Sequence, residues 1–547
     1  MSENIIVTKN LKYPADLPAG LGSLYFKSMQ KHAKQNKIAQ IVHKTGEKDS
    51  YDSLLKRCIR TALYLQEIGI KKDDVVCLVG SVHVNSCVPY IASHFIGAIP
   101  SCIAIDYPKE DKKKLVKILE PKVIFTLPEH VEEMQSICML WNLRAKFVVF
   151  GEYKEETGFE DVNQPNPNED KFEPVEIKNL KDTAIMYFSS GTTGLPKAIC
   201  LNHFSMLINL IKDKNTENPD YDVIKHWANA VDTNFTMIEY IEYFWISAGV
   251  CLSQSIHSGF TRILLEKFEV SNFWQIVDKY KVNFAYVVAN YANDLIRISI
   301  PENCNVSSLV LMLIAGTRIS AECIVALRKM VHPLATVLQG YAQTEFCGAN
   351  TYYDIYNKDH RRLFTEKPQS VGLPSIGYTY KVVDMTTKEI LGPNKQGELL
   401  VKGPTIMNGY YKMDAKDDFD DEGFYKTGDI VYYDEDKSFY IVDRIKGAIK
   451  YKLFIVCSSD IEDILMKHPA VRQAAVFGTA NPEDMNHVTA VVVVEEGSQV
   501  TQEEVREFVD GQVDDYKRIR GGVKFVKSIP ITSTGKIKTS ALRSLME

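Results

Sequence analysis

The stretch Tyr187-Phe-Ser-Ser-Gly-Thr-Thr-Gly-Leu-Pro-Lys197 has the composition of a loop that holds a polyphosphate. Its hydroxyls can donate hydrogen bonds, its glycines let backbone N–H groups approach phosphate oxygens, and its lysine adds a mobile positive charge. The Walker spacing Gly-x-x-x-x-Gly-Lys-Ser/Thr is absent. A solvated linker is the alternative, but linkers rarely follow an apolar, strand-like run such as residues 184–188. The residues predicted to bind ATP here are Ser189, Ser190, Gly191, Thr192, Thr193, Gly194 and Lys197.

The bulk composition narrows the class of protein. A chain of 547 residues exceeds one compact core, so at least two domains are expected. The net charge of -6 and the lack of a long basic run argue against a nucleic-acid partner. The 11 cysteines show neither C-x-x-C pairs nor zinc-type spacing. Apolar runs are too short for an integral membrane segment. We therefore expect an intracellular, cytoplasmic protein, a monomer or weak oligomer, with no C-terminal peroxisomal tripeptide.

Alternation of short β-rich apolar runs with helix-like segments predicts an α/β protein. We expect a large, multi-layer N-terminal α/β domain over residues 1–442 and a small, mobile α+β C-terminal domain over residues 443–547. A polar stretch over 152–170 is expected to be a surface loop or a subdomain joint. Within the small domain, Thr501 and Glu504 form a capping-box pattern at the start of an amphipathic helix. The other expected elements are strands at 75–79, 123–125, 147–150, 284–288, 309–315, 439–442, 474–477 and 490–494, and a helix at 459–467.

Three further segments suit a nucleotide. In Gln339-Gly-Tyr-Ala-Gln-Thr-Glu345 the tyrosine can stack on a purine, the threonine can bond a phosphate and the glutamate can ligate Mg²⁺. Tyr425-Lys-Thr-Gly-Asp429 places a carboxylate where it can accept two ribose hydroxyls. Ile529-Pro-Ile-Thr-Ser-Thr-Gly-Lys536 carries one lysine after a glycine. Taken singly, the first is equally well a strand-to-helix turn, the second a common turn and the third a surface loop.

In this order, over about 350 residues, these motifs resemble the adenylate-forming superfamily. It contains acyl- and aryl-CoA synthetases, peptide-synthetase adenylation domains and beetle luciferases. The stretches at 439–446, 449–452 and 520–526 are most similar to insect luciferases and luciferase-like acyl-CoA synthetases. The resemblance implies that a carboxylic acid attacks Mg-ATP to give an acyl-adenylate and pyrophosphate. A second step then transfers the acyl group to CoA or, in luciferases, oxidises it with O₂, and the small domain rotates between the steps.

The resemblance also implies roles for residues. The loop ending at Lys197 would hold the β- and γ-phosphates, Lys536 would be the catalytic cation, Lys446 the hinge within 443–447, and Lys450 a group of the second step. The adenine would be framed by Gly316, Thr317, Arg318 and Tyr341, the α-phosphate contacted by Thr344, Mg²⁺ bound by Glu345, and the ribose held by Asp429 and Arg444. The acid pocket would be lined by Trp245, Phe346, Cys347, Gly348 and Ala349.

The chain departs from the superfamily pattern at four points. Phe244-Trp-Ile-Ser247 stands where His-His-Gly is frequent, which puts a beetle-luciferin pocket in doubt. Leu453 replaces a glycine, and its side chain could obstruct transfer to CoA. Ala198 and Ala342 also replace glycines and are tolerated if φ is negative there. The leading hypothesis is an acyl-CoA synthetase, the alternative a luciferase monooxygenase, and a remote alternative an inactive binding homologue.

Overall fold

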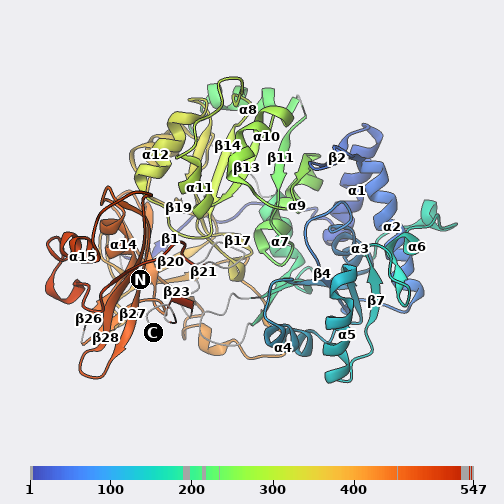
Figure 1. The fold of residues 1–547 in the computed structure, drawn as a ribbon. Coiled ribbons are helices and arrows are strands. Elements are labelled where there is room, and N and C mark those ends of the chain that lie inside the picture. Colours follow the sequence, from blue (N-terminus) through green and yellow to red (C-terminus); the bar gives the residue numbers. More distant parts are fainter. Residues whose placement is uncertain are drawn as a thin grey trace.

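The computed structural model describes residues 4–188, 197–211, 217–232, 234–452, 454–530, 541–542 and 544. They form a large N-terminal part with three main sheets and a small C-terminal domain (Figure 1). In Figure 1 the small domain is orange to red, and the blue and cyan sheet lies at the opposite end of the molecule. No helix in the described part of the chain is long and apolar enough to cross a membrane.

A seven-stranded sheet forms one layer of the large part. Neighbouring strands are parallel except for the hairpin at one edge. Runs such as Phe284-Ala-Tyr-Val-Val288 are apolar throughout because both faces of a parallel sheet are covered. The strands are, in order across the sheet, β15 (Thr336–Gln339), β14 (Leu311–Ala315), β13 (Phe284–Val288), β11 (Thr236–Glu239), β12 (Thr261–Leu264), β2 (Ile38–Val42) and β3 (Lys48–Ser50).

An eight-stranded sheet forms the second layer, and its strand β9 ends directly before the glycine-rich stretch. β9 is parallel to β5 and antiparallel to β10, so it lies inside the sheet rather than at an edge. The strands are β22 (Gly409–Tyr410), β10 (Ala198–Asn202), β9 (Thr183–Phe188), β5 (Ile99–Ile103), β4 (Val75–Val79), β6 (Val123–Thr126), β7 (Lys146–Val149) and β8 (Thr157–Gly158).

The helices of the large part connect these strands and cover the sheets. α1, α2 and α3 pack against one another beside the eight-stranded sheet. The helices are α1 (Leu21–Lys34), α2 (Tyr51–Glu67), α3 (Val88–Ile96), α4 (Lys109–Leu119), α5 (Val131–Leu140), α6 (Phe159–Val162), α7 (His203–Ile211), α8 (Tyr221–Asp232), α9 (Ile246–Ser258), α10 (Phe273–Tyr280), α11 (Ala289–Leu295), α12 (Ala321–Met330) and α13 (Lys358–Glu366). The stretch 152–170, expected to be a loop, contains α6, because Phe159 and Val162 are apolar and pack into the core.

A five-stranded antiparallel sheet completes the large part and carries the chain toward the small domain. Its strands are β1 (Ile6–Val7), β20 (Thr379–Val383), β21 (Gly397–Lys402), β23 (Tyr425–Tyr433) and β24 (Phe439–Arg444). Two short ribbons lie nearby, β16 (Ala342–Gln343) with β17 (Gly348–Ala349), and β18 (Thr351–Tyr352) with β19 (Leu373–Pro374). Ala198 and Ala342 both begin strands, and neither has a positive φ, so the glycine replacements are accommodated as predicted.

The C-terminal domain has its own sheet and core. Its elements are β25 (Ile449–Tyr451), β26 (Phe454–Val456), α14 (Ser458–Leu465), β27 (Val471–Asn481), β28 (Met485–Val494), α15 (Gln502–Asp510) and β29 (Val523–Phe525). The predicted strand at 474–477 is the central part of the longer β27, and the one at 490–494 is the C-terminal half of β28. The capping box of Thr501 and Glu504 is confirmed, with each side chain bonded to the other residue's backbone. The chain changes sheets between Arg444 and Ile449, close to the predicted boundary.

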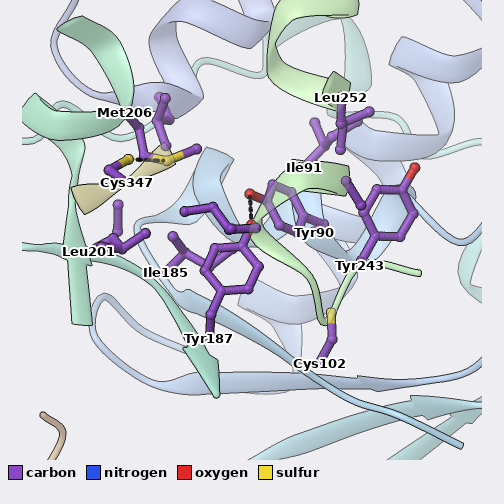
Figure 2. Close-up of a cluster of buried hydrophobic side chains, with 14 of the residues drawn as sticks. Tyr90, Ile91, Cys102, Ile185, Tyr187, Leu201, Met206, Tyr243, Leu252 and Cys347 are labelled. Carbon is purple, nitrogen blue, oxygen red and sulfur yellow. Dashed lines mark hydrogen bonds between the residues drawn. The ribbon is translucent and has the colours of Figure 1, made fainter. Parts of the chain in front are cut away.

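The largest buried cluster joins α3, the eight-stranded sheet and α9 (Figure 2). Its centre is a hydrogen bond of 3.1 Å between the hydroxyls of Tyr90 and Tyr187. Gly249 on α9 is required here, because a Cβ atom would come within 1.9 Å of the Tyr187 oxygen. This close packing fixes the start of α9 relative to the end of β9.

Polar contacts join the small domain to the large part. Arg318 pairs with Asp463 at 2.6 Å, and Arg297 pairs with Glu495 at 2.5 Å. All four side chains remain partly exposed, and ion pairs of this kind contribute at most about 1 kcal/mol each. Breaking these contacts between the two parts therefore costs little free energy.

Beside this interface, burial and the nearby carboxyl groups of Asp443 and Asp463 raise the pKa of Glu462 from 4.5 to about 7, although the Val476 N–H donates to it. The Glu462 carboxyl binds its proton more tightly in the folded protein than in the unfolded chain. Its contribution to the free energy of unfolding therefore falls as the pH rises from 4.5 to about 7. We expect Glu462→Gln to be more stable than the wild type at about pH 8 and equal to it at about pH 4 in urea unfolding. The exposed Glu496→Gln is the control. An equal effect of Glu462→Gln at both pH values would contradict the expectation.

Candidate active site

A cavity of about 2120 Å³ lies between the large part and the C-terminal domain. Residues 311–320, 338–345, 441–450 and 471–478 contribute to its walls, together with the loop that precedes α9. These segments come from three sheets, and the cavity brings together most of the predicted site residues that the structure describes. Those that line it are Trp245, Gly316, Thr317, Arg318, Tyr341, Thr344, Glu345, Gly348, Ala349, Asp429, Arg444, Lys446 and Lys450.

The predicted phosphate loop is only partly described. Ser189, Ser190, Gly191, Thr192, Thr193 and Gly194 lie outside the described residues, as do Leu453 and Lys536. Phe188, the last residue of β9 and the last described residue before this stretch, lines the cavity. Lys197 is described, and its ammonium lies 2.9 Å from Asp418 and 4.3 Å from the centre of the Tyr410 ring.

Asp429 is a carboxylate of the cavity wall with three side-chain partners. The Tyr341 hydroxyl donates to its Oδ2 at 2.6 Å, and the Gln343 amide donates to the same oxygen at 2.5 Å. Arg444 pairs with Oδ1 at 2.8 Å, because the antiparallel register of β23 and β24 sets these two residues opposite each other. Asp429 in turn raises the pKa of the Arg444 guanidinium, so the guanidinium stays charged. The carboxylate is thus fixed in orientation at the cavity wall.

Thr344 and Glu345 lie in a 3₁₀ turn, Thr344–Phe346, that follows β16. The Met407 N–H donates to the Glu345 carbonyl at 2.7 Å and anchors the turn. Burial raises the pKa of the Glu345 carboxyl, while Arg444 acts in the opposite direction. The described residues contain no group of three metal-ligating side chains. A single carboxylate at the wall still fits Mg²⁺, which completes its shell with phosphate oxygens and water.

The acid pocket differs from the expectation at two residues. Phe346 and Cys347 are fully buried in the core rather than exposed to the cavity. Phe346 packs edge-on against Tyr425 with ring centres 5.5 Å apart, and Cys347 contacts Met206, sulfur to sulfur, at 3.1 Å (Figure 2). Cys347 has a φ of 61°, which reverses the chain and turns both side chains inward. Trp245, Gly348 and Ala349 remain at the cavity wall.

Lys446 lies in the turn that connects β24 of the large part with β25 of the small domain. The hinge expected over residues 443–447 falls at this connection. Lys450 lies on β25, is exposed and faces the cavity.

Two residues of the cavity were not singled out from the sequence. Gln343 holds Asp429 and also donates to the Thr427 carbonyl at 3.1 Å. Glu242 lines the cavity three residues before Trp245. In the sequence, Gln343 is a polar residue within the segment Gln339–Glu345 that was predicted to bind the nucleotide. Glu242 is the charged residue within the largely aromatic stretch from Tyr240 to Trp245. Neither pattern reveals which partner the side chain has.

Comparison with known proteins identifies the class to which this fold and cavity belong. Residues 29–411 match the AMP-binding enzyme family, and residues 460–536 match the AMP-binding enzyme C-terminal domain. The chain belongs to this family of adenylate-forming enzymes.

Relatives and solved structures agree with this assignment. The chain is 29% identical over 554 residues to a luciferin 4-monooxygenase of Nipponoluciola cruciata, which covers 100% of this chain and 98% of that one. It is 29% identical over 505 residues to a probable 4-coumarate–CoA ligase 2 of Dictyostelium discoideum, at 89% and 88% coverage. The luciferase-like enzyme of the nonluminescent mealworm Zophobas morio is 30% identical with a TM-score of 0.71, over 80% of this chain and 99% of that one.

The network around Asp429 can be tested through nucleotide affinity. Gln343→Leu removes one donor from the carboxylate and keeps the side-chain volume, so we expect the Kd for ATP to rise about tenfold. Isothermal titration calorimetry measures this change. Gln473→Leu is the control, since this amide lines the cavity from the small domain and has no hydrogen bond to Asp429 in the described structure. Equal affinities of Gln343→Leu and the wild type would show that the amide does not support the nucleotide.

Proposed function

We propose that this enzyme activates a carboxylic acid with Mg-ATP and transfers the acyl group to CoA. A carboxylate oxygen of the acid attacks the α-phosphorus, and the bond from that phosphorus to pyrophosphate breaks. The thiol then attacks the acyl carbon of the adenylate and AMP leaves. The observation that carries the proposal is the meeting of Tyr341, Thr344, Glu345, Asp429 and Arg444 at one cavity wall.

The roles follow from chemistry and position. Asp429 and Arg444 would hold the ribose, Tyr341 would lie against the adenine, and Thr344 would contact the α-phosphate. Glu345 would bind Mg²⁺, which when bound neutralises charge on the phosphate oxygens. Gly316, Thr317 and Arg318 would complete the adenine site.

The remaining roles belong to the loop and the small domain. Residues 189–194 with Lys197 would hold the β- and γ-phosphates. Lys536 would stabilise the negative charge that develops at the α-phosphorus. Residues 443–447 would form the hinge between a large domain, 1–442, and the small domain.

The second candidate is a luciferase, in which O₂ replaces CoA as the second substrate. The observation in its favour is that a relative named luciferin 4-monooxygenase aligns with this chain along its whole length. Adenylation is common to both candidates, so only the second product separates them.

Product analysis tests both candidates together. Purified protein is given Mg-ATP, O₂ and a panel of fatty, aryl and luciferin-like acids, with and without CoA. Pyrophosphate, thioester and photons are recorded in each reaction. We expect a CoA-dependent thioester without light. Photons that need ATP and acid but not CoA would establish the luciferase, and the absence of pyrophosphate with every acid would contradict the proposed activation step.

Lys536→Ala tests the first step. We expect the rate of pyrophosphate release to fall at least about a hundredfold while ATP still binds. The reason is that the lysine cation would stabilise the transition state and not the bound ATP. The exposed Lys527→Ala is the control and should retain the wild-type rate. Turnover that survives in Lys536→Ala would remove Lys536 from the catalytic assignment.

Lys450→Ala tests the second step. We expect the rate of thioester formation to fall about tenfold or more while pyrophosphate release is retained, because Lys450 faces the cavity from β25. Lys452→Ala is the matched control, since that lysine is paired with Asp484 at 3.2 Å. A parallel loss of both products in Lys450→Ala would contradict a role confined to transfer.

A further inference from the structure

Glu242 is a carboxylate of the cavity wall that the proposed chemistry does not use. It lies in the loop between β11 and α9, where its carbonyl accepts from the Trp245 N–H at 3.1 Å. Phe188 and Trp245 line the cavity with it. The Glu242 side chain therefore lines the same cavity as Trp245 of the predicted acid pocket and the end of β9.

One carboxyl oxygen of Glu242 has no hydrogen-bond partner among the residues that the structure describes. This atom, Oε2, is buried. Glu239, only three residues earlier, shows the contrast: it pairs with Arg262 through both oxygens at 3.2 Å and accepts from Tyr243. A buried carboxyl group normally has such donors, so the missing donor at Glu242 is the exception.

The charges near Glu242 do not supply a counterion. Burial and the like charge of Asp106 raise the pKa of Glu242 to about 7, well above its ordinary value of 4.5. Cys102, at the end of β5, is the other ionisable neighbour that interacts with it. Neither group is a cation, so the described residues leave a place for a positive or donating group that completes the environment.

The chemistry of the ligand can be narrowed by exclusion. Phosphate oxygens of ATP and the reacting carboxylate of the acid are negative and would repel an ionised Glu242. The divalent cation of the proposed reaction is assigned to Glu345, and the described residues hold no group of three metal-ligating side chains that would bind another at Glu242. An N–H or O–H group remains, and the cavity offers it aromatic surfaces at Phe244 and Trp245.

We propose that Glu242 is a specificity-determining residue that binds an amino or hydroxyl substituent on the acid substrate. The inference rests on the proposed activation of an acid with ATP and names the class of acid. An acid with such a substituent supplies the missing donor to Glu242. An unsubstituted acid of the same skeleton leaves the carboxyl group buried and unpaired, which a site of this kind discriminates against strongly.

The test compares matched acids by pyrophosphate release. Each aryl or fatty acid is paired with its amino- and hydroxyl-substituted forms, with the substituent placed at each position along the skeleton. We expect the wild type to favour one substituted acid over its parent by about tenfold or more in kcat/KM. Glu242→Leu should abolish this preference, while Glu242→Gln should keep the preference for hydroxyl and lose the preference for a charged amine.

Three outcomes separate the possibilities. A preference that is unchanged in Glu242→Leu, or a wild type that favours every unsubstituted parent, overturns the inference but leaves the activation of acids in place. No pyrophosphate with any acid overturns the proposed function, and this inference with it. If Glu242→Leu does not fold, Glu242→Gln, which keeps the shape of the side chain, is used to test the substrate preference instead. The control is Glu266→Gln, a carboxyl group on the same cavity that is exposed and paired with Lys44 at 3.2 Å.

Discussion

The buried carboxylate of Asp429 is the interaction on which the nucleotide side of the cavity depends. Its side chain is only 4% exposed, and an unpaired charge at that depth would cost several kcal/mol, about the effect of removing one partner of a buried ion pair. Tyr341, Gln343 and Arg444 supply the compensating donors. Tyr341 and Gln343 come shortly after β15 of the seven-stranded sheet, and Arg444 is the last residue of β24 in the five-stranded sheet. One carboxylate therefore joins two sheets at the point where the chain leaves for the small domain.

The two parts of the protein are stabilised in different ways. Within the large part, Arg262 and Glu239 form an ion pair that is almost completely buried, with exposures of 1% and 2%, and breaking such a pair costs about 3–5 kcal/mol. Between the parts, Arg318 with Asp463 and Arg297 with Glu495 remain partly exposed. The proposed rotation of the small domain would need a rigid large part and a weakly held interface. Weak ion pairs at the interface keep the free energy needed to reorient the small domain low.

Local patterns explain how much the sequence predicts. The strands at 75–79 and 284–288 follow from unbroken apolar runs, and the capping box at Thr501 needs only neighbouring residues. The sequence predicted residues for the nucleotide because their types and spacing resemble those of the superfamily, and the structure brings Tyr341, Asp429 and Arg444 to one cavity. The inward turn at Cys347 could not, since it depends on a left-handed backbone and on packing against Met206, 141 residues away in the chain. The partners of Gln343 and Glu242 are likewise set by distant segments.

We expect the cavity to separate activation from selection. The residues assigned to the nucleotide are joined by the side-chain network around Asp429, so substitutions there are expected to affect all acids alike. The loop over residues 240–245 connects β11 with α9 and lines the cavity, so its side chains are expected to meet the acid rather than the nucleotide. Trp245 and Glu242 lie on this loop, one adding an aromatic surface and the other an acceptor. A change of acid can therefore arise at this loop without disturbing Asp429, which explains how one activation site can serve relatives with different named reactions.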